Sequence, residues 1–221
     1  MRDLLPLPVV VVQATPDMWN TPLRSEEEAF LERAVEKRRR EFRAGRACAR
    51  RALQVLGLST DILSVGPDRA PVWPAGVVGS ITHSGDFCAA AVAWREAFAG
   101  IGIDAERRRA IGPELVSRIC TPAEQRWIKS AAPPPDGSSG DWPTLVFSAK
   151  ECLYKALPSS SGRRHLDFQD ANVSVVPNEG VFCIEMNPHR QPWGLTRHFR
   201  GRFRMTREYV LAALTLPGPG N

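Results

Sequence analysis

The sequence predicts a mixed fold of the α+β type, within the α/β class, in which helices and strands alternate twice. Its 221 residues, 43% of them apolar, suffice for one compact core or two modest ones. Apolar residues recur at helical spacing up to Gly57. Short runs with strand character lie in each half of the chain, although the halves share no detectable identity.

The first half is expected to open with a strand at residues 9–13, followed by helical sequence. Ser25 and Glu28 have the spacing of a capping box, which predicts one long helix or two consecutive ones ending at Gly57. Gly45 is a candidate break. This segment carries a stripe of arginines at spacings of four, three and four, which either faces solvent or forms a binding face: Arg39, Arg43, Arg46 and Arg50.

A hairpin is predicted next, from residues 77–82 and 87–94, with His83 at its bend. The turn residues Ser84, Gly85 and Asp86 join its two arms. Residues 101–104 read as a further strand that ends in a charged turn of three arginines.

The second half is expected to repeat this mixture. Thr121 and Glu124 form a capping box with Pro122 at the first helical position, so a helix should run toward Ser130. The low-complexity stretch PPPDGSSGD at 133–141 is expected to be an exposed loop. A helix over residues 148–157 and strands near 172–176, 181–186 and 209–216 complete the prediction.

The charge balance favours phosphate-bearing or acidic partners. The formal net charge is +5, and only four of the 29 basic residues are lysines. The planar guanidinium of arginine matches phosphate better than an ammonium does, although a solvated basic surface has the same composition. Five cysteines without a C-x-x-C pair indicate a reduced protein, expected in the cytoplasm, and no apolar run reaches the length of a membrane span.

Two carboxylates lie at the predicted end of the strand at 101–104. Asp104 and Glu106 are two residues apart, so on a strand both side chains point the same way. Mg²⁺ accepts one or two carboxylates and fills its remaining positions with water and phosphate oxygens. The pair is therefore a candidate magnesium site, and a solvated strand end is the alternative.

The segment FSAKECLYK at 147–155 carries an acid and a base on one predicted helix face. Glu151 and Lys155 are four residues apart, which also suits a surface ion pair, and Ser148 with Glu151 has capping-box spacing. Neither alternative explains the apolar residues of this helix, which would anchor it in a core: Phe147, Leu153 and Tyr154. A rigid acid beside a rigid base suits proton transfer and phosphate neutralisation.

A third group surrounds His83 in the sequence GSITHSG at 79–85. Imidazole and hydroxyl groups at a turn can donate hydrogen bonds to phosphate, and glycines allow close approach. A packing or surface role for the histidine is the alternative.

In this order and spacing, the motifs resemble the Sfp-type 4′-phosphopantetheinyl transferase family. The resemblance rests on GIDAE at 102–106, FSAKECLYK at 147–155, W-P-x-G-x-x-G-S-I-T-H-S at 73–84 and the basic helical block at 38–50. It implies two similar subdomains related by a pseudo-twofold axis. Residues 1–108 would bind the coenzyme A phosphates and supply two metal ligands, and residues 109–221 would supply the third ligand and the catalytic helix.

The resemblance implies transfer of the phosphopantetheine arm of coenzyme A to a serine of an acyl or peptidyl carrier protein, with release of 3′,5′-ADP. Asp104, Glu106 and Glu151 would bind Mg²⁺, with Mn²⁺ as the alternative. Glu151 would deprotonate the carrier serine, and Lys155 would stabilise the leaving group. The residues implied for coenzyme A are basic or hydroxylic: Arg38, Arg46, Arg69, Thr82, His83, Lys150 and Lys155.

No membrane or nucleic-acid partner is expected, and the doubled fold favours a monomer. Two rival functions remain. A nucleic-acid-binding module explains the arginine stripe but gives the three carboxylates no role. A magnesium-dependent nuclease uses similar residues, although its usual E-x-K spacing is absent here, since Lys155 follows Glu151 by four.

Overall fold

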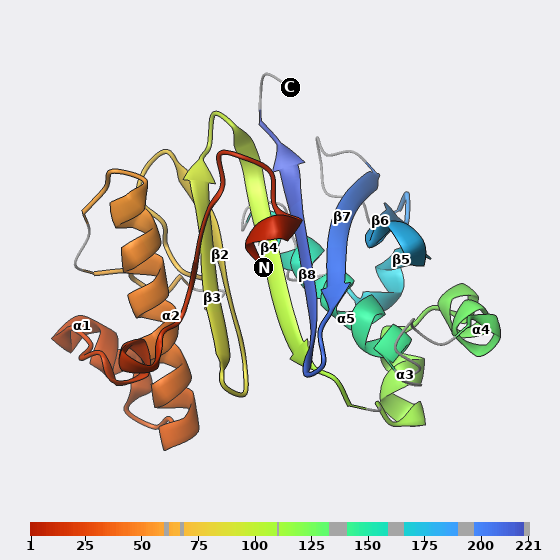
Figure 1. Cartoon of the computed structure of the whole chain (residues 1–221), viewed down its shortest axis with the longest axis horizontal. Coiled ribbons are helices and arrows are strands. Elements are labelled where there is room, and N and C mark those ends of the chain that lie inside the picture. The colour runs from red at the N-terminus through yellow and green to blue at the C-terminus, as the bar shows by residue number, and fades with distance from the viewer. Residues whose placement is uncertain are drawn as a thin grey trace.

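Two antiparallel sheets lie side by side in the protein (Figure 1). The computed structural model describes residues 1–59, 62–66, 69–109, 111–132, 141–158, 166–189 and 197–218. The first sheet has the strand order β1 (Val10–Gln13), β3 (Phe87–Trp94), β2 (Val77–Ser84). The second has the order β4 (Phe98–Arg107), β8 (Tyr209–Pro217), β7 (His198–Met205), β6 (Val181–Met186), β5 (Ala171–Val176).

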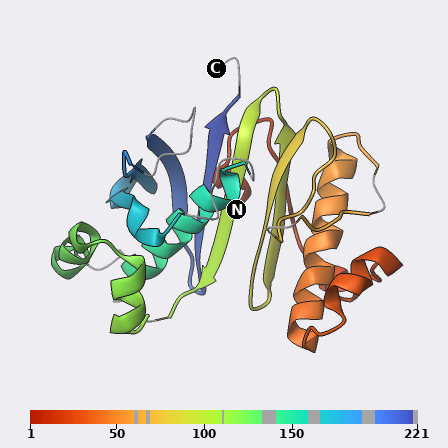
Figure 2. The same cartoon turned by 180° about the vertical axis from the view of Figure 1, so that it is seen from behind.

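One long helix packs against each sheet. The α-helices are α1 (Ser25–Glu28), α2 (Glu36–Val55), α3 (Pro113–Ile119), α4 (Pro122–Ser130) and α5 (Asp141–Ala156). Buried residues of α2 form a core with β2 and β3, and α5 forms another with the second sheet. Figure 2 shows α5 lying across β8 and β4. These elements confirm the α+β class that the sequence predicts.

The helical segment of the first half breaks earlier than Gly45. A short 3₁₀ helix follows α1, and α2 begins at Glu36. Arg24, not Ser25, is the N-cap residue of α1, because its backbone N–H donates to the Glu27 carboxylate at 3.2 Å. The predicted helices therefore exist as two consecutive ones, but the predicted capping pair is displaced by one residue.

The arginine stripe of α2 fastens the helix to the segment before it. Arg50 pairs with the fully buried Glu27 at 2.8 Å, and the Arg46 Nε lies 3.8 Å from the same carboxylate. The other two members of the stripe also reach acids, in the pairs Arg39–Glu28 and Arg43–Glu36. The stripe is therefore largely engaged inside the protein, and a fully solvated face is wrong.

The strand β4 belongs to the second sheet, although its residues precede the expected boundary at residue 108. It pairs with β8 along its length, and Asp104 lies opposite Ala212. Odd-numbered residues of β4 enter a core shared with β3, namely Ile101, Ile103 and Ala105. Because side chains alternate along a strand, the even-numbered residues face α5.

Several predicted elements are confirmed and others were missed. The hairpin of β2 and β3, the capped helix α4, and the strands β5, β6 and β8 lie where the sequence predicts them. His83 is not at the bend of the hairpin, because β2 continues to Ser84 and His83 pairs with Cys88. The strand β7 and the helix α3 were not expected, and α5 begins at Asp141, well before residue 148. The loop predicted at 133–141 falls outside the described residues except for Asp141.

None of the helices in the described part of the chain combines the length and apolar character needed to cross a membrane.

Two glycines let α5 touch the backbone of β4. A Cβ placed on Gly102 would lie 1.7 Å from the Cys152 carbonyl oxygen, and one on Gly100 would lie 2.0 Å from that of Ala156. No side chain fits in that space. The two glycines therefore set how closely the residues of α5 approach those of β4.

Gly102→Ala is expected to destabilise the protein by about 3 kcal/mol or more, because the clash is with backbone that cannot rotate away. Thermal and urea unfolding measure the loss. Gly112→Ala is the matched control, since a Cβ there meets nothing within 4 Å. Equal stability of the two variants would contradict the close packing of α5 on β4.

Candidate active site

Asp104 is the centre of a polar group between β2, β4 and α5. It is buried, at 3% exposure. Its Oδ1 accepts hydrogen bonds from Lys155 Nζ at 2.6 Å and Thr82 Oγ1 at 3.3 Å, and its Oδ2 accepts one from Ser148 Oγ. The three donors come from two elements, so the position of this carboxylate depends on how α5 and β2 meet β4.

The spacing of α5 explains which of its side chains reach β4. Ser148, Glu151 and Lys155 are separated by three and four residues, so they share one face of the helix. Ser148 lies in the middle of α5 and its hydroxyl binds Asp104, which excludes the capping-box alternative. The sequence suggested no role at Asp104 for this serine.

The acidic residues repel one another across this group. Burial raises the pKa of Glu106 to about 7, and the negative charges of Asp104 and Glu151 raise it further. The positive charges of Lys155 and Arg109 act in the opposite direction. Burial also raises the pKa of Glu151, opposed by Lys155 and reinforced by Asp104. The three carboxylates therefore influence one another electrostatically.

Lys155 is the cation that faces these acids. Burial disfavours its charged form, yet Asp104 and Glu151 together raise its pKa, so it stays protonated. It also donates to the Ile103 carbonyl oxygen at 3.3 Å. The Lys155 ammonium pairs with the buried Asp104, and not with Glu151 in a surface ion pair.

The three carboxylates are not gathered around one point. Within the residues that the structure describes, no group of three or more His, Cys, Asp or Glu side chains is arranged to hold a metal ion. Their donor atoms are all oxygens, which suits Mg²⁺ or Mn²⁺. The metal-ligand assignment of Asp104, Glu106 and Glu151 stays a prediction.

His83 connects this group to α2. Its Nε2 lies 2.8 Å from an Arg38 guanidinium nitrogen, and its Nδ1 lies 3.5 Å from the Glu41 carboxylate. Burial lowers its pKa, opposed by Glu41 and reinforced by Arg38 and Lys155. Arg38 and His83 are thus neighbours, as expected of residues that would share one anion.

A cavity of about 830 Å³ lies beside Lys155, between β2, β4 and the end of α5. Arg69 lines it together with Lys155, Trp73 and Tyr154. Of the basic residues implied for coenzyme A, Arg69 and Lys155 therefore border one cavity. Its apolar walls and basic rim can accommodate an extended ligand that carries phosphate.

Arg46 is not among the residues that line this cavity. Its side chain is 4% exposed, and its guanidinium lies over the Phe42 ring, 4.3 Å from the ring centroid. Burial lowers its pKa to about 10, partly offset by Glu27. Its proposed contact with a coenzyme A phosphate remains a prediction that would require the side chain to become accessible.

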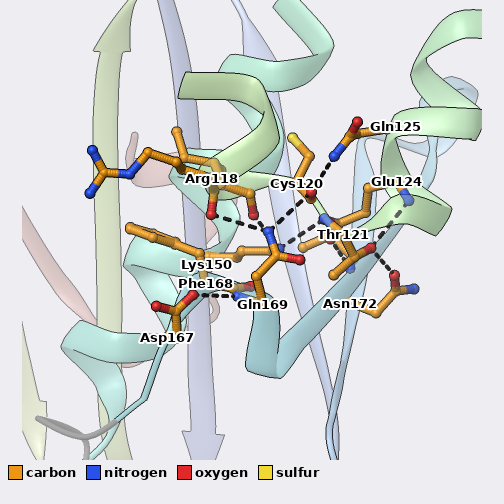
Figure 3. Close-up of polar contacts among 12 residues, drawn as sticks. Arg118, Cys120, Thr121, Glu124, Gln125, Lys150, Asp167, Phe168, Gln169 and Asn172 are labelled. Atoms are coloured by element: carbon orange, nitrogen blue, oxygen red, sulfur yellow. Dashed lines mark hydrogen bonds and ion pairs between the residues drawn. The ribbon is translucent and has the colours of Figure 1, made fainter. Parts of the chain in front are cut away.

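Lys150 lies away from the carboxylates, contrary to its predicted role at the phosphates. It is fully buried, and its Nζ pairs with Glu124 Oε2 at 2.8 Å and donates to the carbonyl oxygens of Ile119 and Phe168 (Figure 3). Burial lowers its pKa, opposed by Glu124. Lys150 lies two positions after Ser148, so it belongs to another face of α5. Its contacts join α3, α4 and the 3₁₀ helix before β5 to that helix.

Thr82 likewise forms hydrogen bonds within the protein. It is 2% exposed, and its hydroxyl accepts from the Ala105 N–H at 3.0 Å while donating to Asp104. On a strand, Thr82 and His83 point to opposite faces, so both cannot face one phosphate. The predicted contact of Thr82 with coenzyme A is therefore not supported by its surroundings.

The start of α5 is fixed by Arg108. Its Nε donates to the Asp141 carboxylate at 2.7 Å, and another guanidinium nitrogen donates to the Thr206 carbonyl oxygen at 2.6 Å. This residue ties the end of β4 to the first turn of α5 and to the β7–β8 turn. The charged turn that follows β4 therefore has a structural role that the sequence did not indicate.

The fold and this group define an enzyme built from two α+β halves with an acidic and basic cluster at their junction. A model of the 4′-phosphopantetheinyl transferase N-terminal domain matches residues 26–93, and one of the 4′-phosphopantetheinyl transferase superfamily matches residues 100–214. The chain belongs to the 4′-phosphopantetheinyl transferase superfamily, of the Sfp type, as the sequence predicts.

Relatives that resemble the chain over most of its length carry the same name. The chain is 38% identical to the 4′-phosphopantetheinyl transferase Svp of Streptomyces mobaraensis, over 98% of this chain and 89% of the relative. It is 38% identical to Npt of Nocardia iowensis, over 85% and 86%, and 37% identical to PptT of Mycobacterium tuberculosis, over 89% and 86%.

Proposed function

We propose that the protein transfers the 4′-phosphopantetheine arm of coenzyme A to a serine hydroxyl of an acyl or peptidyl carrier protein and releases 3′,5′-ADP. The observation that carries the proposal is the group of Asp104, Glu106, Glu151 and Lys155 beside the cavity. The names of Svp, Npt and PptT support the same activity.

The roles of the residues follow from their charges. Lys155 and Arg69 border the cavity and would neutralise the phosphates of coenzyme A. The carrier serine oxygen forms a bond to the phosphorus next to the pantetheine, and the pyrophosphate P–O bond breaks as 3′,5′-ADP leaves. Glu151 accepts the serine proton, a role that suits a carboxylate whose pKa burial has raised.

A divalent metal fits the same donor set. Asp104, Glu106 and Glu151 would hold Mg²⁺, with Mn²⁺ as the alternative, because all three offer hard oxygen ligands. Asp104 Oδ1 has two hydrogen-bond donors and Oδ2 has one among the described residues, which leaves Oδ2 an acceptor position. When bound, the ion would offset charge on the pyrophosphate.

The partners follow from the proposed chemistry and the charge. Carrier proteins are typically acidic, so a chain of net charge +5 is electrostatically matched to them and to coenzyme A. The protein is expected to act as a monomer and to use neither nucleic acid nor a membrane.

The test incubates the protein with coenzyme A, Mg²⁺ and a panel of apo carrier proteins, and follows carrier mass. The expected result is a gain of one phosphopantetheine arm on at least one carrier, abolished by EDTA and by replacing the acceptor serine with alanine. Unchanged carriers throughout the panel would overturn the proposal. A plasmid incubated in parallel should stay intact, since cleavage would favour the nuclease.

A further inference from the structure

The two sheets meet at β2 and β4 without a backbone ladder between them. β4 is the edge of its sheet, with β8 on its other side, and β2 is the edge of the first sheet. An edge strand leaves every second N–H without a strand partner, and such groups are costly when buried. Some other group must therefore accept hydrogen bonds from β4.

Hydroxyl side chains on every second residue of β2 accept these hydrogen bonds from β4. Ser80 Oγ accepts from the Ile103 N–H at 3.2 Å, Thr82 Oγ1 from that of Ala105 at 3.0 Å, and Ser84 Oγ from that of Arg107 at 3.2 Å. Each rung joins residues 23 apart, so β2 and β4 run parallel. We call these three side chains the hydroxyl ladder.

Two rungs of the hydroxyl ladder also hold a carboxylate. While Thr82 accepts from Ala105, its hydroxyl proton points to Asp104 Oδ1 at 3.3 Å. Ser84 repeats the arrangement with Glu106 Oε2 at 3.5 Å, a longer contact on a half-buried residue. Ser80 has no such contact, because the residue before its partner is Gly102.

We propose that Thr82, and more weakly Ser84, are positioning residues that set the carboxylates of Asp104 and Glu106 for the metal. The inference rests on the proposed function, in which these carboxylates bind Mg²⁺. A hydroxyl whose lone pair is fixed by a β4 N–H has its proton directed at the neighbouring acid. The first sheet thereby orients ligands carried by the second.

The test compares four single variants by the binding of Mn²⁺ alone, measured by calorimetry on the full chain without coenzyme A. Thr82→Val should weaken binding by about tenfold or more, as removal of a group that orients a metal ligand does. Ser84→Ala should weaken it by about threefold, because the contact of Ser84 with Glu106 Oε2 is long at 3.5 Å and therefore weak. Thr82→Ser should restore wild-type affinity.

Ser80→Ala is the matched control, because it removes a rung of equal burial that touches no carboxylate. It should lower the melting temperature about as much as Thr82→Val and leave Mn²⁺ affinity unchanged. In transfer assays, Thr82→Val should raise the Mg²⁺ concentration for half-maximal rate while retaining most of the rate at saturating Mg²⁺. A purely structural role would lower stability without this shift.

The outcomes separate the two proposals. If the wild type transfers the arm and binds Mn²⁺ but Thr82→Val binds it as Ser80→Ala does, the positioning role is overturned and the proposed function stands. If the wild type binds no Mn²⁺, the positioning role and the metal-ligand assignment fail, and the proposed transfer is decided by the carrier assay alone. If Thr82→Val does not fold, Ser84→Ala decides, since this half-buried site tolerates truncation better, and unchanged affinity there overturns the inference.

Discussion

Asp104→Asn is expected to lower the rate of arm transfer by at least about 10²-fold, because even groups that only orient a metal ligand change activity by ~10 to 100-fold. The asparagine keeps one acceptor oxygen for its neighbours but loses the charge that would hold Mg²⁺. Glu151→Gln should act in the same direction, since it removes both a metal ligand and the proposed base. Steady-state kinetics with an apo carrier at several Mg²⁺ concentrations measures the effect.

The choice of asparagine matters because Asp104 is buried and bound by three donors. Alanine would leave Lys155, Ser148 and Thr82 without a hydrogen-bond acceptor. A loss of stability could then not be separated from a loss of activity. The control is Asp86→Asn on the β2–β3 turn, where the carboxylate is 76% exposed. A wild-type rate in Asp104→Asn, with Mg²⁺ still required, would show that the ligand assignment is wrong.

Lys150→Met is expected to destabilise the protein by about 3 to 5 kcal/mol, because it leaves the buried Glu124 carboxylate without its cation. Glu124 is 1% exposed and also accepts from the N–H groups of Thr121 and Val173. The charge that remains therefore cannot turn toward water. Urea unfolding of the variant and of wild type gives the difference in free energy of unfolding.

This variant also separates the observed place of Lys150 from its predicted role. If Lys150 is structural, the KM for coenzyme A stays near wild type at temperatures where the variant is folded. A stable variant with a strongly raised KM for coenzyme A would instead indicate that Lys150 contacts the phosphates, as the sequence predicted. Lys129→Met, on the nearby helix α4, is the control for losing one positive charge, and Lys150→Met/Glu124→Gln should recover part of the lost stability.

Much of the site was predictable because it depends on local periodicity. The spacing of Glu151 and Lys155 on a helix, and of Asp104 and Glu106 on a strand, holds in the structure. The same periodicity indicates that Lys150 leaves the face shared by Ser148 and Glu151, and that Thr82 and His83 point apart. Lys150 and Thr82 were assigned to the phosphates because they belong to the family motifs. Membership of a motif does not specify which face of a helix or strand a side chain occupies.

The partition of the sheets was beyond local reasoning. β4 pairs with β8, more than a hundred residues later, and no pattern within either strand identifies that partner. β7 was missed for another reason. Its apolar positions Phe199 and Phe203 alternate with arginines, and they are buried while the arginines are exposed, so the signal was present but weak in apolar content.

The close approach at Gly100 and Gly102 limits which parts of the molecule can move. A helix whose carbonyl groups touch a strand cannot rotate about its axis without collision, so α5 and β4 behave as one rigid body. Asp104, Glu151 and Lys155 all lie on that body. β2 meets it through three side-chain hydroxyls and without a backbone ladder, so adjustment to a bound substrate is expected at this seam, beside His83 and Arg38.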